Sequence, residues 1–216
     1  MKKLKLLLWN GSTNREGNTQ EVLNFAAEEL RKDGAEAELF WIGPEHVHEC
    51  RFCRQCEDTG RCVIDDPVNG FLKKAAEADG FIFAVPAHRI ASGRSVLNFF
   101  SRCMFAGRDI LRLKPAAVIT LARRSAESSG NDMVNKHILN CEMPLIASKY
   151  WNIGINAQSP KELFKNKENV RDVCTITADM VYYLQCREAG TEANIAKPER
   201  IRSAFELPNP TEGEND

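Results

Sequence analysis

A continuous apolar run, Phe81-Ile82-Phe83-Ala84-Val85, stands between Gly80 and Pro86. A strand that is apolar on both faces is typical of a parallel sheet covered by helices on each side. Further apolar runs of strand length lie at residues 4–9, 35–42, 116–121 and 145–147. Apolar residues also recur at helical spacing in 18–31, 66–78, 92–105, 129–140 and 160–187. Strands that alternate with helices predict a doubly wound α/β fold, with a parallel five-stranded sheet in the order 2-1-3-4-5.

The chain has 216 residues, which is enough for one domain with a full core. Its net charge of -1 gives no reason to expect a nucleic acid or an anionic membrane as a partner. The apolar run at 4–9 is too short to span a bilayer and no cleavage site follows it, which favours a cytoplasmic protein. We expect a single domain at 1–197 with a cysteine-rich insertion at 50–62, and a flexible acidic tail at 198–216.

A polar segment, Gly11 to Thr19, joins the first predicted strand to the first predicted helix. At such a junction the chain offers free backbone N–H groups and the positive end of a helix dipole. Short hydroxyl and amide groups are added by Ser12, Asn14, Asn18 and Thr19. The segment has neither the Gly-Lys-Ser/Thr ending of a nucleoside triphosphate loop nor a G-x-G-x-x-G fingerprint. It fits a phosphate monoester, or else it is a polar loop in which Asn18 or Thr19 caps the helix.

Thirteen residues contain four of the eight cysteines: Cys50, Cys53, Cys56 and Cys62. In a reducing compartment such thiols are more often metal ligands or redox groups than disulfides. The C-x2-C-x2-C spacing is close to that of [4Fe–4S] ligands, although zinc or thiols without a metal also fit. His46 and His48 precede the segment and are further candidate ligands. The other four cysteines lie within helical patterns, where isolated thiols are typically small buried apolar residues.

Together these motifs resemble the NADPH-dependent FMN reductase and iron–sulfur flavoprotein branch of the flavodoxin-like proteins. The first loop is similar to the family's G-S-x-R-x-x-G-N-T loop, with the arginine one place later, at Arg15. The cysteine segment matches the family's C-x2-C-x2-C-x5-C motif and acidic continuation. Pro86 matches the start of the family's second flavin loop, and Phe99 and Arg102 match the helix after that loop. The later matches are Ala122-Arg123-Arg124, Met143-Pro144 and Tyr150-Trp151-Asn152.

The resemblance implies a flavodoxin-like fold, FMN as the cofactor and NAD(P)H as the reductant. It also implies a [4Fe–4S] cluster on the four cysteines and assembly as a homodimer or homotetramer. The electron acceptor would be a quinone, a nitro compound, a flavin, an iron centre or a redox protein. The residues that the resemblance assigns to FMN are Ser12, Asn14, Asn18, Thr19, Pro86, Ala87, His88, Arg89, Arg123 and Arg124.

The sequence departs from the family pattern beside the flavin. His88 stands where relatives usually have a tyrosine, and Ser101 stands where they have an aspartate before the helix arginine. Because the cofactor carries the chemistry, His88 is a candidate modulator of the flavin, and no catalytic acid or base is expected. Two alternatives remain open: an iron–sulfur flavoprotein module that is fed by ferredoxin, and a non-catalytic thiol or metal sensor on the same fold.

Overall fold

The computed structural model of the chain describes residues 3–88, 91–122, 127–148 and 153–199. The chain divides into two compact units, Met1–Gln185 and Cys186–Asp216. The first unit holds the sheet and all the candidate residues for cofactor and metal binding. The predicted domain limits at 1–197 and 198–216 stay a prediction.

The sheet consists of five parallel strands in the order β2-β1-β3-β5-β6. These are β1 (Lys5–Asn10), β2 (Glu36–Trp41), β3 (Gly80–His88), β5 (Ala116–Ala122) and β6 (Ile153–Asn156). Counted along the parallel strands, this is the predicted order 2-1-3-4-5, so the doubly wound α/β prediction is confirmed. A short strand that the sequence did not predict, β4 (Ala91–Ser92), pairs antiparallel with the end of β3.

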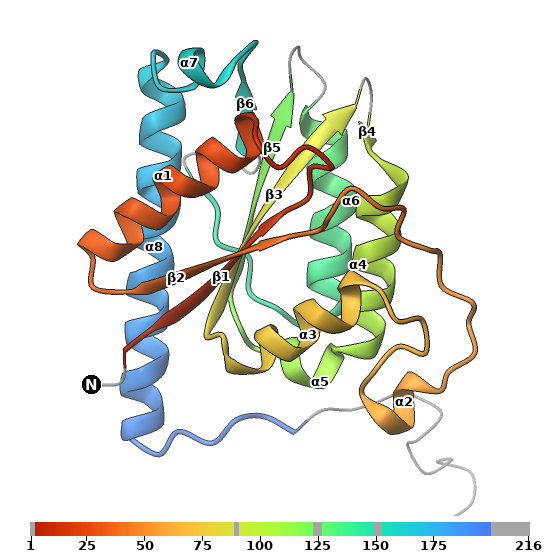
Figure 1. The fold of residues 1–216 in the computed structure, drawn as a ribbon. Helices are drawn as coiled ribbons and strands as arrows, with labels where there is room; N and C mark the ends of the chain where they lie inside the picture. Colours follow the sequence, from red (N-terminus) through yellow and green to blue (C-terminus); the bar gives the residue numbers. More distant parts are fainter. Residues whose placement is uncertain (1–2, 89–90, 123–126, 149–152, 200–216) are drawn as a thin grey trace, which may run out of the picture. The chain divides into compact units, whose positions relative to one another are not determined.

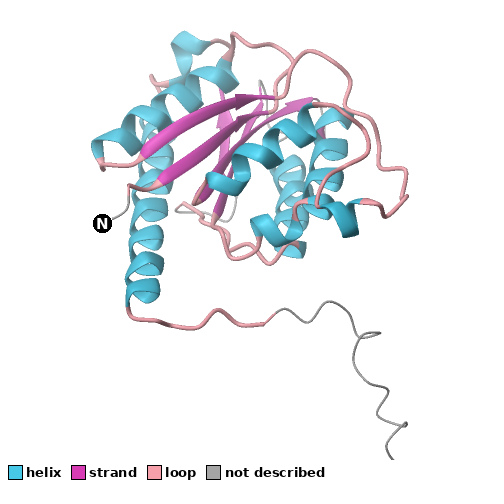
Figure 2. Cartoon of the chain, turned by 60° about the horizontal axis from the view of Figure 1, so that its bottom comes forward, coloured by secondary structure: helices cyan, strands magenta, loops and turns pink. Residues whose placement is uncertain are grey.

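Helices cover both faces of this sheet (Figures 1 and 2). One face packs against α1 (Asn18–Lys32) and α8 (Lys167–Glu192), and the other packs against α3 (Pro67–Glu77), α4 (Arg94–Ala106) and α6 (Glu127–Asn140). The remaining helices are single turns: α2 (Cys56–Thr59), α5 (Arg108–Leu111) and α7 (Pro160–Leu163). In the part of the chain that the structure describes, no helix has the length and apolarity needed to cross a bilayer.

Alternation along the strands separates two apolar cores. Leu8 and Ile82 point to the α1 and α8 face, whereas Trp9 and Phe83 point to the opposite face. Trp9 is fully buried, and its ring centroid lies 4.7 Å from that of Phe99 on α4. This aromatic packing fixes α4 against the strands whose carboxyl ends carry the candidate site.

The last predicted strand was misplaced. Leu145, in the predicted strand 145–147, makes a single bridge to Ala116, whereas the fifth parallel strand is β6 at Ile153–Asn156. The segment around Leu145 pairs only with Ala116, the first residue of β5. The N–H of Ala116 donates to the carbonyl of Pro144, and the carbonyl of Ala116 accepts from the N–H of Ile146. An edge strand with alternating polarity gives a weaker sequence signal than a buried strand.

Two other predicted boundaries also need correction. Pro86 was expected to close the third strand, but β3 continues through Pro86 to His88 because the short β4 pairs with its end. The helix expected at 160–187 is divided into α7 and α8. Asn166 separates them, since its Oδ1 accepts from the N–H of Glu168 at 2.9 Å and starts a new helix.

Candidate functional site

The loop at the carboxyl end of β1 is built from three successive side-chain turns. Oδ1 of Asn10 accepts from the N–H of Ser12, Oγ of Ser12 accepts from Asn14, and Oδ1 of Asn14 accepts from Glu16, at 2.9, 3.1 and 3.1 Å. Short polar side chains favour such turns because their oxygens reach the N–H two residues ahead. This pattern fixes the path of the loop without any apolar core of its own.

The same pattern leaves backbone donors available. Within the described residues, the N–H groups of Thr13, Arg15 and Gly17 make no hydrogen bond. Gly17 is the N-cap of α1, and no described side chain caps that helix. The first N–H groups of α1 therefore have no partner among the described residues, and they lie at the positive end of the helix dipole. Such a set of donors suits an anionic oxygen ligand, such as a phosphate.

The four residues assigned to this loop from the sequence have different surroundings. Ser12 and Asn14 lie in the loop itself and shape it. Asn18 donates from Nδ2 to the carbonyl of Ala157, 2.8 Å away, and so ties the start of α1 to the residue after β6. Thr19 is buried. The structure places all four around one helix start but gives Asn18 a bond within the protein.

Trp41, the last residue of β2, supports this loop. Its Nε1 donates to the carbonyl oxygen of Ser12 at 2.7 Å. The guanidinium carbon of Arg15 lies 5.5 Å from the centre of the same ring. Asn10 is buried and donates from Nδ2 to Gln20 on α1. Asn10 and Trp41 each end a strand beside the loop, and that position is the signal that could have found them.

The second candidate loop follows β3. Pro86 and Ala87 are partly buried, and the pairing of β3 with β4 turns the chain back at His88. The backbone of His88 pairs with Ala91, but the side chain of His88 lies outside what the structure describes. The other assigned residues outside the described ranges are Arg89, Arg123 and Arg124, together with the family motif at 150–152.

The carboxyl ends of these strands lie beside one another. The N–H of Gly11 donates to the carbonyl of Ala84 at 3.0 Å, which joins the first loop to β3. Pro86 is in register with Leu121 near the end of β5. The neighbouring Thr120 is fully buried, and its Oγ1 has no hydrogen-bond partner among the described residues. An orphaned hydroxyl at this end of the sheet fits a polar group that is supplied from outside the protein.

The cysteine segment between β2 and α3 is almost entirely loop apart from α2 (Figure 2). Phe52 and Arg54 adopt left-handed backbone conformations, with φ of 54° and 62°, and turn the chain between the cysteines. The N–H of Phe52 donates to Sγ of Cys50 at 3.4 Å. Backbone N–H donation to sulfur stabilises a thiolate, which is the form that binds metal.

The four thiols interact electrostatically. Burial raises the pKa of the Cys56 thiol, and the neighbouring Cys62, Cys50 and Cys53 thiols raise it further. Four sulfurs on one short loop are the donor set of an iron–sulfur cluster or of zinc. Over the described ranges, however, no three His, Cys, Asp or Glu side chains are arranged to hold a metal ion. His46 instead faces Ser95 on α4, with Nδ1 at 3.4 Å from Oγ.

Cys62 is attached to the core by Asn69, which the sequence analysis did not single out, and by Arg102, which it matched to the family's helix arginine but did not connect with the cysteines. Asn69 on α3 accepts from the N–H of Cys62 at 3.0 Å and donates to its carbonyl at 2.9 Å. The guanidinium of Arg102 on α4 donates to Sγ of Cys62 and pairs with Asp66. The sequence signal for Arg102 is a charged residue on the apolar face of a helix, between Phe99 and Cys103.

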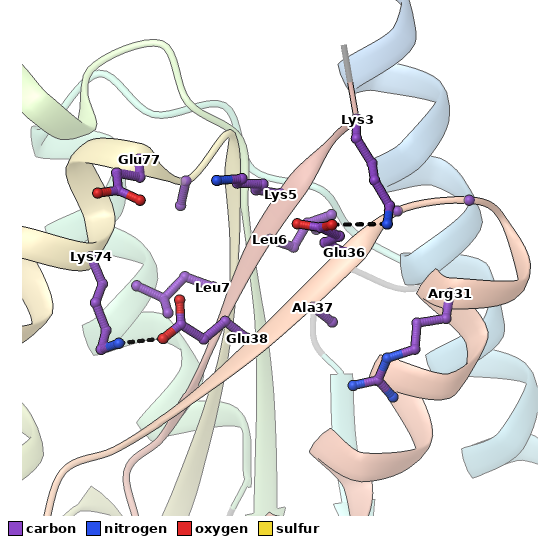
Figure 3. Close-up of a pocket in the computed structure, with 13 residues that line it drawn as sticks. Lys3, Lys5, Leu6, Leu7, Arg31, Glu36, Ala37, Glu38, Lys74 and Glu77 are labelled. Carbon is purple, nitrogen blue, oxygen red and sulfur yellow. Dashed lines mark hydrogen bonds and ion pairs between the residues drawn. The ribbon is translucent and has the colours of Figure 1, made fainter. Parts of the chain in front are cut away.

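A cavity of about 460 Å³ lies at the other end of the sheet (Figure 3). It is lined by the first residues of β1 and β2 and by the last turn of α3. Four of its charged side chains are paired, since Lys3 binds Glu36 at 2.8 Å and Lys74 binds Glu38. Ligands of doubly wound sheets bind at the carboxyl ends of the strands, so this cavity is not the candidate cofactor site.

The solved structures that the chain resembles share its fold. A flavone reductase matches with a TM-score of 0.62 at 15% identity, covering 91% of this chain and 66% of that one. A flavodoxin from the domain Archaea matches with a TM-score of 0.56 at 10% identity, covering 84% of this chain and 99% of that one. At these identities the similarity shows the flavodoxin-like fold alone.

Sequence comparison gives nearer relatives. An iron–sulfur flavoprotein of Methanocaldococcus jannaschii is 33% identical over 85 residues, which are 39% of this chain and 44% of the relative. An iron–sulfur flavoprotein of Methanosarcina thermophila is 26% identical over 129 residues, which are 60% of this chain and 68% of the relative. The chain thus spans less than half of one relative and about two thirds of the other. The sequence model of the NADPH-dependent FMN reductase family matches residues 4–158, and the chain belongs to that family.

Proposed function

We propose that the protein is an FMN-dependent oxidoreductase that takes electrons from NAD(P)H and passes them to a small acceptor. The observation that carries the proposal is the loop at 11–17, whose N–H donors stand at the uncapped start of α1. The family match over residues 4–158 supports the same assignment. The acceptors that we propose are a quinone, a nitro compound, a flavin or an iron centre.

The first loop would hold the phosphate of FMN. Its donors are the backbone N–H groups of Thr13, Arg15 and Gly17, and no lysine is required because N–H groups and hydroxyls can bind a monoester. The second loop, which begins at Pro86, would lie along the ring system. When bound, FMN supplies the hydride and electron-transfer chemistry, while the protein orients the flavin and excludes competing reactions.

The experiment that tests this proposal is an anaerobic titration of the purified protein with FMN and, separately, with riboflavin. We expect FMN to bind at least about tenfold more tightly, because riboflavin lacks the phosphate that the loop receives. Addition of NADH or NADPH should then bleach the flavin absorption band. Equal binding of both flavins would contradict the phosphate loop, and a flavin that stays oxidised would contradict direct reduction by a nicotinamide.

A second candidate function is favoured by the cysteine segment. The relatives named iron–sulfur flavoproteins support a [4Fe–4S] cluster on Cys50, Cys53, Cys56 and Cys62. In that case the protein is an electron-transfer module that is fed by ferredoxin. Reduction by ferredoxin without reduction by NAD(P)H would select it, provided that iron and acid-labile sulfide are present in equal amounts.

A third outcome would point to a sensor. Protein that binds no FMN but binds zinc, or that oxidises its thiols reversibly, would move the assignment to a thiol or metal sensor. Assembly as a homodimer or homotetramer and a cytoplasmic location remain predictions, and light scattering on the purified protein would measure the assembly.

A further inference from the structure

The side chain of Asn10 is a buried amide at the point where β1 enters the loop at 11–17. Asn10 lies in the middle of the sheet, where its backbone pairs with Trp41 of β2 on one side and with Ala84 of β3 on the other. Leu8, two residues earlier, packs into the core beneath α1 and α8. Because side chains alternate along a strand, the fully buried side chain of Asn10 points to the same face, toward α1.

A chain of three amides leads from Asn10 onto α1. Nδ2 of Asn10 donates to Oε1 of Gln20 at 2.9 Å, and Nε2 of Gln20 donates to Oδ1 of Asn24 at 2.9 Å. Gln20 and Asn24 are four residues apart, so they are neighbours on one face of the helix. In the other direction, Oδ1 of Asn10 accepts from the N–H of Ser12 at 2.9 Å. We call the side chains of Asn10, Gln20 and Asn24 the amide relay, because they connect α1 with the start of the loop.

The direction of the amide relay is fixed by the backbone. An amide side chain carries a donor and an acceptor that can exchange places, but the N–H of Ser12 can only donate. The atom of Asn10 that faces it is therefore the oxygen, and Nδ2 must face Gln20. Gln20 must then present Oε1 to Asn10 and Nε2 to Asn24. Loss of the Gln20 amide would leave the buried Nδ2 of Asn10 without this partner, and an unpaired buried donor is costly.

The amide relay bears on which N–H groups of the loop are available to a ligand. Side-chain oxygens take the N–H groups at positions 12, 14 and 16. The N–H groups at positions 13, 15 and 17 make no hydrogen bond within the described residues. Asn10 forms the first of the three side-chain turns, and Ser12, whose N–H it holds, forms the second with its own Oγ. The alternation along the loop therefore begins at Asn10.

The packing of α1 does not depend on the amide relay. The helix buries an apolar face that includes Val22, Leu23 and Ala26. Its first residue is tied to β6 separately, because Nδ2 of Asn18 donates to the carbonyl of Ala157 at 2.8 Å. The amide relay thus adds little that the helix needs, whereas it gives the loop its first hydrogen bond.

We propose that Gln20 is a positioning residue of the phosphate-binding loop. Through Asn10 it keeps the N–H of Ser12 bound within the protein and leaves the N–H groups at 13, 15 and 17 available to an anionic ligand. This inference rests on the proposed binding of FMN, whose phosphate these donors would receive. Since Asn10 is fully buried, the amide relay acts on the ligand only through the loop. It should therefore affect the phosphate of FMN and leave the ring system unaffected.

The test compares three variants of the full chain. Gln20→Met keeps the length of the side chain and a good helix former but removes the amide, and Gln20 is only half-buried, which favours a folded variant. Asn24→Ala is the matched control, because it removes an amide from the same face of α1 but keeps the bond between Gln20 and Asn10. Gln20→Glu is the conservative variant, because its carboxylate still accepts from Nδ2 of Asn10.

The first measurement is hydrogen exchange of the loop N–H groups, followed by NMR in protein without flavin. In the wild type, the N–H groups at 12, 14 and 16 should exchange more slowly than those at 13, 15 and 17. Gln20→Met should speed the exchange of the Ser12 N–H at least about threefold, whereas Asn24→Ala and Gln20→Glu should leave it slow. Slow exchange of Ser12 in Gln20→Met would overturn the inference independently of any flavin.

The second measurement is the affinity for FMN and, separately, for riboflavin. Gln20→Met should bind FMN about tenfold more weakly than the wild type and riboflavin within about twofold of it, while Asn24→Ala should bind both within about twofold. An equal loss of both affinities in Gln20→Met would show a merely structural role and overturn the inference, leaving the proposed function intact. Wild-type protein that binds FMN no more tightly than riboflavin would instead overturn the proposed phosphate site, and this inference with it.

Discussion

The indole of Trp41, the last residue of β2, donates from Nε1 to the main-chain carbonyl of Ser12, 2.7 Å away. An edge strand thereby holds the loop that follows the neighbouring strand. We expect Trp41→Phe to weaken FMN binding about fivefold, since one hydrogen bond contributes about 1 kcal/mol and its loss loosens the loop. Fluorescence titration would measure the change. Riboflavin is the control ligand, and an equal loss of riboflavin affinity would show that the effect is not on the phosphate loop.

Gly11 and Gly17 lie at the two ends of that loop and differ in the space that is available for a side chain. A Cβ on Gly11 would lie 2.3 Å from Cζ3 of Trp9 and 3.1 Å from the carbonyl oxygen of Ala84. A Cβ on Gly17 would meet nothing closer than 3.4 Å. Gly11→Ala should lower the free energy of unfolding by about 1–3 kcal/mol, as overpacking does, whereas Gly17→Ala should change it by less than about 0.5 kcal/mol. Urea denaturation would compare them, and equal losses would contradict the packing at Gly11.

His137 on α6 gives stability a pH dependence. Burial lowers its pKa below the ordinary value of 6.5, and its ring stacks 6.4 Å from that of Phe100. The unfolded chain therefore binds a proton more readily than the folded chain. The free energy of unfolding should fall as the pH drops through 6.5, by at most about 1.4 kcal/mol per pH unit from this residue.

The variant His137→Phe isolates this contribution because it keeps an aromatic ring beside Phe100 and removes the titrating group. Urea denaturation at several pH values between 5 and 8 would give the slope of the free energy of unfolding against pH. This slope should be shallower in the variant, and the difference should not exceed about 1.4 kcal/mol per pH unit, the limit for one proton. An identical slope in both proteins would show that His137 does not titrate on unfolding in this range.

The cysteines should differ sharply in reactivity. Burial raises the pKa of the Cys103 thiol well above 9.0, and the Cys141 thiol donates to the carbonyl of Met104 inside the core. Cys53, by contrast, is exposed. In the folded, metal-free protein, iodoacetamide should label Cys53 and the equally exposed Cys186 first, and leave Cys103 and Cys141 unmodified until denaturant is added. Mass spectrometry of tryptic peptides would give the order, and early labelling of Cys103 would contradict its burial.

The fold could be predicted largely because its central strands are buried on both faces. In a chain that alternates strands with helices, apolar runs such as Phe81–Val85 and Ala116–Leu121 are read as buried parallel strands. The order of these strands in the sheet follows from the right-handed crossover connections between them. The fifth strand could not be placed in this way. Ile153-Gly154-Ile155-Asn156 alternates at the sheet edge, and its position depends on pairing with Ile119–Ala122.

The site was only partly accessible from the sequence. The polarity of Ser12 and Asn14 indicated the loop, since such residues favour turns at a strand end. The partners of the loop and of the cysteines, however, come from distant parts of the chain. Trp41 reaches Ser12 across 29 residues, and Arg102 reaches Cys62 across 40. Contacts of that kind depend on the packing of whole elements, which local spacing does not encode.

The cysteine segment is attached to α4 both before its first cysteine and at its last cysteine, so the residues between these two points could be replaced without disturbing the rest of the fold. Asn98 and Arg102 fix the chain at Val47 and His48 and again at Cys62, so the residues between these points carry little of the fold's stability. Segments of other lengths or ligand sets could join the same two anchors at small entropic cost. One flavodoxin-like scaffold can in this way gain or lose a metal centre through a change in a single connection.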